Sequence, residues 1–169
     1  MTNKELVISL IQAAHQKRFD DLMALIDEHQ PDLSHDDFIF KTDNGTITGS
    51  VAHVLVCYVA KYGSCAEMGK ILPLGCCPNS NMRAATELTL ETRTQIGMPT
   101  IGIDKYYVES RPLFNAIDEH KEDMVDLLLN YACPCCNGAG AKATQNLLDK
   151  AQEVGQTAIY NKLLAAFTE

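Results

Sequence analysis

Four segments of the chain repeat one pattern, in which two short helices follow each other with a tight turn between them. The clearest copy is residues 111–130. Its first helix opens with Arg111-Pro112, and proline suits the first turn of a helix because its missing N–H costs no hydrogen bond there. Its second helix carries four apolar residues with helical spacing, Met124, Val125, Leu128 and Leu129. A turn around His120 joins the two helices. The pattern predicts antiparallel helix pairs that stack side by side and bury each other's apolar faces.

The other three copies have similar lengths and similar apolar spacing. Their expected helices are residues 6–14 with 19–28, residues 51–60 with 65–74, and residues 147–152 with 157–166. In the turn of the second copy, Gly63 is expected to adopt a positive φ. We expect one domain over residues 1–169, made of four units at about residues 4–30, 46–79, 110–136 and 143–167.

The units resemble ankyrin repeats, which have about 33 residues with a β-turn finger and two antiparallel helices. Arg111-Pro112-Leu113-Phe114 stands in place of the family's Thr-Pro-Leu-His opening, and residues 60–64 and 151–156 match its inter-helix turn. Residues 74–79 stand where the family's finger begins. The resemblance implies a mainly α fold, an ankyrin-like helix–turn–helix repeat solenoid with β-hairpin or irregular insertions.

The spacing of the units predicts two insertions. Equivalent positions at Ala13, Val59, Ala116 and Ala151 are separated by 46, 57 and 35 residues, and only the last value is near the family period. The insertions fall at about residues 33–49 and 80–109. In the first, residues 38–42 and 46–48 flank Asp43-Asn44-Gly45, which predicts a β-hairpin with an Asn-Gly turn. The second favours strands, although residues 84–95 would also fit one face of a helix.

Charge and cysteine content narrow the class of protein. Acidic residues number 22 and basic residues 14, giving a formal net charge of −8, which argues against nucleic acid or an anionic membrane surface as a partner. No apolar run is long enough to span a bilayer, and residues 1–4 lack a signal-peptide pattern. The seven cysteines are an odd number, so a disulfide framework is not expected. These features predict a cytoplasmic protein, or a secreted effector that acts in a host cytosol.

Two cysteine clusters leave a zinc-stapled structural module as one alternative. They are Cys76-Cys77 and Cys133-Pro134-Cys135-Cys136, at equivalent places in two units. Four thiolates could hold zinc in a tetrahedron and staple an insertion to the array. Adjacent cysteines rarely both bind one ion, however, neither cluster is identified as a Cys-x-x-Cys motif, and neither contains a histidine. The prediction is therefore no metal site and no cofactor, with small buried or surface thiols instead.

A cysteine-dependent enzyme is the second alternative, with a nucleophile such as Cys57 or Cys136. His53 lies four residues before Cys57 on an expected helix, so the two side chains share a face and could form an activated pair. The apolar residues between them, Val54, Leu55 and Val56, favour a packed core face instead. No phosphate-binding or zinc-protease motif is present. We therefore predict a protein without catalytic residues.

The resemblance implies a protein–protein interaction module, such as an adaptor, an inhibitor or an effector, that binds through a concave acidic surface. A complementary partner would carry a basic patch. Tyr62, Tyr106 and Tyr107 are the expected anchors, because tyrosine contributes a large contact area at low entropy cost. Charge reversal at Asp118 and Glu119 is expected to weaken capture without lowering stability. The predicted partner-binding residues are Asp43, Asn44, Lys61, Tyr62, Tyr107, Ser110, Asp118, Glu119 and Glu153.

Overall fold

The computed structural model describes residues 3–33, 40–42, 45–47, 51–79 and 111–167, and it is mainly helical. Two short 3-10 turns, η2 (Leu72–Leu74) and η4 (Pro134–Cys136), follow the second and third helix pairs. The four predicted helix pairs are confirmed. They are α1 (Asn3–His15) with α2 (Phe19–His29), α3 (Val51–Tyr62) with α4 (Cys65–Ile71), α7 (Pro112–Asp118) with α8 (Glu122–Asn130), and α9 (Gln145–Glu153) with α10 (Thr157–Ala166).

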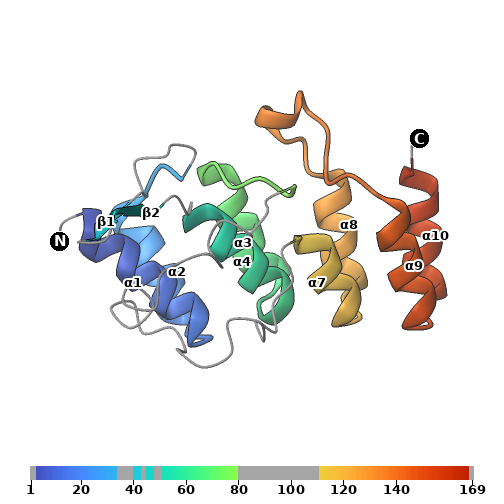
Figure 1. Ribbon diagram of the computed structural model, residues 1–169, viewed down its shortest axis with the longest axis horizontal. Coiled ribbons are helices and arrows are strands. Elements are labelled where there is room, and N and C mark those ends of the chain that lie inside the picture. Colours follow the sequence, from blue (N-terminus) through green and yellow to red (C-terminus); the bar gives the residue numbers. More distant parts are fainter. Residues whose placement is uncertain (1–2, 34–39, 43–44, 48–50, 80–110, 168–169) are drawn as a thin grey trace.

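The helix pairs lie side by side in a row along the longest axis of the molecule (Figure 1). The first helices form one layer, in which α1 packs on α3, α3 on α7 and α7 on α9. The second helices form the other layer, in which α2 packs on α4, α4 on α8 and α8 on α10. Apolar side chains from both layers form one continuous core that includes Leu10, Leu55, Ile117 and Leu163, none of them measurably exposed. Each pair therefore buries its apolar faces against its neighbours.

Three of the four inter-helix turns share one backbone geometry. A residue in the left-handed region lies two positions after the end of the first helix, with φ of 60° at Lys17, 57° at His120 and 73° at Gly155. The next residue donates its N–H to the carbonyl five positions earlier. These bonds run from Arg18 to Ala13 (2.8 Å), from Lys121 to Ala116 (2.9 Å) and from Gln156 to Ala151 (3.0 Å). The three alanines are the positions that the sequence pattern treats as equivalent.

The second turn differs, and the prediction of a positive φ at Gly63 is wrong. The Gly63 N–H donates to the Val59 carbonyl at 2.8 Å, and α4 then begins with a capping box between Ser64 and Glu67. A Cβ at position 63 would lie 2.9 Å from Cγ1 of Val59 and 3.0 Å from its carbonyl oxygen. Glycine is needed here for this close approach.

The first insertion contains the predicted hairpin strands. β1 (Phe40–Thr42) pairs antiparallel with β2 (Gly45–Ile47), and Phe40 lies opposite Ile47. The turn residues Asp43 and Asn44 lie outside the described residues, as does the insertion at residues 80–109. In the part of the chain that is described, no helix combines the length and the apolar character needed to cross a bilayer.

Candidate functional site

The inter-helix turns lie along one edge of the row (Figure 1), which we call the turn edge and define as residues 16–18, 63–64, 119–121 and 153–156. Beside it, lysines and carboxylates join neighbouring helix pairs. The Lys61 ammonium at the end of α3 lies 3.4 Å from Oδ2 of Asp118 and 3.7 Å from Oε1 of Glu119. The Lys150 ammonium on α9 lies 3.2 Å from Oδ1 of Asp118. Asp118 on α7 therefore binds lysines from the pairs on both sides.

The charges of this network depend on one another. Partial burial opposes ionisation of Asp118, but the ammonium groups of Lys150 and Lys61 outweigh it and lower the pKa of this carboxyl group. Lys61 is only 8% exposed, so without the carboxylates its ammonium would be a largely buried, unpaired charge. The predicted binding residues Lys61 and Asp118 thus serve the contact between the second and third helix pairs.

Tyr62 is covered by lysines of its own chain. The ammonium of Lys17, in the turn of the first pair, lies 4.1 Å from the centre of the Tyr62 ring, and that of Lys61 lies 5.8 Å from it. The Tyr58 ring lies nearby, with 6.2 Å between ring centres and an angle of 35° between the ring planes. Tyr62 is half-buried and contacts the first pair as well as its own.

The layer of second helices has ion pairs of the same kind. Lys70 on α4 lies 3.0 Å from Asp27 on α2, and Lys162 on α10 lies 2.9 Å from Asp126 on α8. These side chains are exposed enough for solvent to screen the attraction within each ion pair, so each stabilises the fold only weakly. Both ion pairs have one feature in common with the contacts of Asp118: each connects a helix of one pair to a helix of the neighbouring pair.

The other predicted binding residues differ in accessibility. Glu119 and Glu153 are exposed beside the turns of the third and fourth helix pairs. The structure brings four of the predicted residues together where the second helix pair meets the third: Lys61, Tyr62, Asp118 and Glu119. The remaining predicted residues, Asp43, Asn44, Tyr107 and Ser110, lie outside the described residues, as does the expected anchor Tyr106.

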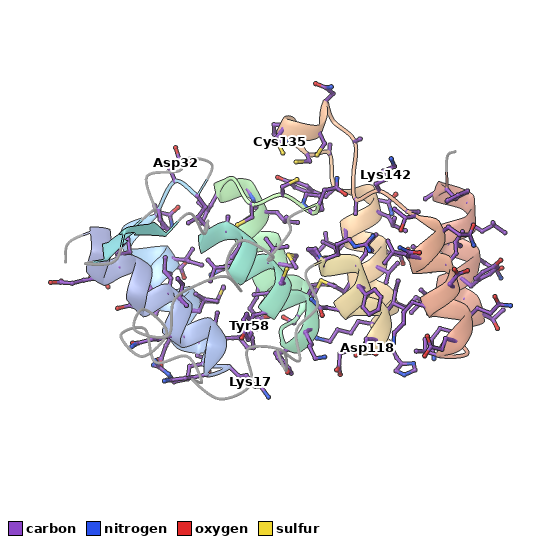
Figure 2. All side chains as sticks on the ribbon, viewed as in Figure 1. Lys17, Asp32, Tyr58, Asp118, Cys135 and Lys142 are labelled. Atoms are coloured by element: carbon purple, nitrogen blue, oxygen red, sulfur yellow. The ribbon has the colours of Figure 1, made fainter. Side chains whose placement is uncertain are left out.

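At the opposite edge of the row, four thiols meet (Figure 2). The Sγ atoms all lie within 4.8 Å of one another, although they come from two loops. One thiol follows η2, and the other three lie in the loop after α8. Four of the six Sγ–Sγ distances lie between 3.1 and 3.8 Å. We call this group the four-cysteine cluster: Cys77, Cys133, Cys135 and Cys136.

Asn79 holds the two loops of the cluster together. Its side-chain amide donates to Sγ of Cys136 at 3.4 Å and to the Gly140 carbonyl at 3.1 Å, and its Oδ1 accepts the Lys142 N–H at 2.8 Å. Its backbone N–H donates to Sγ of Cys77 at 3.4 Å. Two sulfur atoms of the cluster therefore each accept a hydrogen bond from this residue.

The thiols have different proton affinities. The Asn79 amide lowers the pKa of Cys136, whereas the hydrogen bond with Cys133 raises the pKa of Cys135 to about 11. Burial raises the pKa of Cys77. A thiolate charge is therefore easiest to place on Cys136, which receives the amide hydrogen bond.

Adjacent cysteines are not expected to share one site, yet Cys135 and Cys136 both belong to this cluster. The 3-10 turn η4 puts Cys135 and Cys136 on the same side of the loop, and Cys133 and Cys136 have the Cys-x-x-Cys spacing typical of zinc sites. That spacing is the sequence signal that could have identified the cluster. Cys76 is 2% exposed and belongs to the core, so only its neighbour Cys77 reaches the other three thiols.

The proposed nucleophile Cys57 is fully buried within α3, so no substrate could reach its thiol without opening the core. The side chain of its predicted partner His53 lies outside the described residues. The other proposed nucleophile, Cys136, is a member of the four-cysteine cluster.

No protein-family model, no curated protein and no solved structure matches this chain.

Proposed function

We propose that this chain is a protein-binding module that uses the turn edge, and that its helix pairs form an ankyrin-like repeat stack. One observation carries the proposal: the four helix pairs form a row with their turns along one edge, so residues distant in sequence share one long surface. The repeated turn geometry and the 35-residue spacing of Ala116 and Ala151 support the ankyrin-like arrangement.

The turn edge is ordered before any partner binds. The ion pairs of Asp118 with Lys61 and Lys150 link three successive helix pairs. Because these side chains are already held in place, binding a partner would cost less conformational entropy. Glu119 and Glu153 remain exposed on this edge. With a net charge of −8 on the chain, a partner with a basic patch would be steered towards the molecule. On the turn edge itself, Glu119 and Glu153 are the acidic contacts, and Lys17, Arg18 and Lys121 lie on the same edge. In this proposal the chain carries no chemistry of its own.

The test compares three single charge reversals with the wild-type chain. Glu119→Lys and Glu153→Lys alter the turn edge, and Glu28→Lys, at an exposed position near the end of α2, is the matched control. Each immobilised chain is incubated with lysate, and captured proteins are identified by mass spectrometry. We expect a partner that wild type and Glu28→Lys retain equally, with retention reduced about tenfold by either turn-edge variant, as for loss of about 1.4 kcal/mol of binding.

Equal retention by all four chains would rule out the turn edge as the binding surface. Asp118 is not used in this test because reversing its charge would leave Lys61 and Lys150 without their shared carboxylate. Glu119 also lies 3.7 Å from Lys61, so retention by Glu119→Lys is compared only after thermal unfolding shows that the variant is as stable as wild type. The expectation that a reversal there spares stability conflicts with these contacts, and we now expect such a variant to be less stable.

A further inference from the structure

We propose that the four-cysteine cluster binds one zinc ion, which fastens the loop after α4 to the loop after α8.

The geometry of the sulfur atoms supports a tetrahedral ion. With zinc–sulfur bonds of about 2.3 Å, the sulfurs of a tetrahedral site lie about 3.8 Å apart. Here Cys77 Sγ lies 3.5 Å from Cys136 Sγ and 3.6 Å from Cys133 Sγ, and Cys135 Sγ lies 3.8 Å from Cys136 Sγ. The pair Cys133–Cys135 is closer, at 3.1 Å, and would have to move apart for both sulfurs to bind one ion. The two other Sγ–Sγ distances, Cys77–Cys135 and Cys133–Cys136, are no longer than 4.8 Å. All seven cysteines of the chain are free thiols, so none of the four is committed to a disulfide.

The chemistry of the donors favours zinc. Thiolate sulfur is a soft ligand, and four sulfurs in a tetrahedron are typical of zinc or of iron–sulfur centres. Binding forms four zinc–sulfur bonds and releases the four thiol protons to solvent, leaving a site with a net charge of −2. The two N–H groups of Asn79 that donate to sulfur atoms stabilise part of this negative charge, as outer-shell donors do in metal sites.

The position of the cluster indicates a structural role. Four protein ligands leave no open coordination position for a substrate or an activated water. Cys77 and Cys133 are 56 residues apart in sequence, so an ion held between them would close a long loop and join the second helix pair to the third. The cluster lies across the row from Asp118 and Lys17 (Figure 2), so this inference does not depend on the turn edge as a binding surface.

The experiment measures metal in the full chain, expressed with zinc in the medium and purified under reducing conditions without chelators. We expect about one zinc ion per chain by elemental analysis in wild type. After replacement of zinc by cobalt(II), we expect the visible bands of tetrahedral cobalt and a near-ultraviolet thiolate charge-transfer band. Removal of the metal by a chelator is expected to lower the thermal midpoint.

Two variants and one control assign the ligands. Cys135→Ser changes the most exposed thiol of the cluster, so its fold should survive, and it is expected to weaken zinc affinity at least about tenfold in chelator competition. Asn79→Ala, which removes the amide donor, is expected to weaken affinity by about tenfold or more with the ligands intact. Cys65→Ser, a half-buried cysteine outside the cluster, should bind zinc as wild type does.

Four results would overturn the proposal: well under one zinc per chain in the folded wild type, iron in place of zinc, an octahedral cobalt spectrum, or equal zinc affinity in Cys135→Ser and wild type. The first three need no variant, so the test remains decisive if a substitution unfolds the chain.

Discussion

Replacing Gly140 with alanine is expected to lower the free energy of unfolding by about 3 kcal/mol, at the upper end of the overpacking range. A Cβ at this position would overlap the Leu129 carbonyl group and would lie 3.0 Å from the Leu128 carbonyl oxygen. These are backbone atoms at the end of α8, which cannot rotate away. The loop cannot retreat freely either, because the Ala141 N–H donates to the Leu128 carbonyl at 2.8 Å. Urea unfolding followed by circular dichroism measures the change.

Two other glycines separate steric overlap from the general effect of adding a methyl group. Gly138 has a φ of 82° and no heavy atom within 4 Å of an added Cβ, so Gly138→Ala is expected to destabilise by only about 1 kcal/mol. Gly69 lies within α4 with the same free space, and Gly69→Ala is expected to stabilise by about 0.5–1 kcal/mol. If Gly140→Ala were no more costly than Gly138→Ala, the loop after α8 would not lie on the end of that helix as described.

Replacing Asn115 with alanine is expected to lower the free energy of unfolding by about 2 kcal/mol. The Asn115 side chain is fully buried, and its amide donates to the Cys57 carbonyl on the neighbouring α3 at 3.3 Å. The substitution removes this bond between the second and third helix pairs and leaves a small cavity. Thermal and urea unfolding provide the measurement.

An exposed asparagine is the matched control for Asn115. The Asn130 amide also donates to a backbone carbonyl, that of Asp126 within its own helix, at 2.9 Å. Because Asn130 is exposed, water can replace this bond, and Asn130→Ala is expected to change stability by less than about 0.5 kcal/mol. Equal effects of the two substitutions would contradict the buried contact between α7 and α3.

The helices could be predicted because their signals are local. Apolar spacing within each segment and the residues at the turns were enough to place all four helix pairs within a few residues of their ends. Gly63 shows where a local rule fails: glycine suggests a positive φ, but here it is required by the nearby Val59 side chain and carbonyl. Sequence alone does not distinguish these two reasons for a glycine.

The site could be predicted less well because its contacts are long-range. Lys61 and Asp118 were expected to face a partner, but they are 57 residues apart in sequence and face each other. In the same way, Cys76 and Cys77 are adjacent residues of the same type. Only the packing of the loop after η2 places the Cys77 side chain in the cluster and the Cys76 side chain in the core. Such contacts depend on which helix pairs stack together.

A double-mutant cycle on Lys61 and Asp118 tests most directly whether the second and third helix pairs stack as described. The four chains are wild type, Lys61→Met, Asp118→Asn and the double variant, measured by urea unfolding at neutral pH. Solvent screens Asp118, which is 34% exposed, so we expect a favourable coupling of about 1 kcal/mol. The folded-state pKa of Asp118 is lowered, so the coupling should be fully present above the pKa of the unfolded chain and should disappear as pH falls through the folded-state value.

The control cycle combines Lys61→Met with Asp27→Asn, because Asp27 pairs with Lys70 in the other layer and does not contact Lys61. The effects of these two substitutions on the free energy of unfolding should be additive. A coupling of about 1 kcal/mol between Lys61 and Asp118, with additivity in the control, is the result that the stacked row predicts. Additive effects in both cycles would contradict it, because the ends of α3 and α7 would then not be in contact.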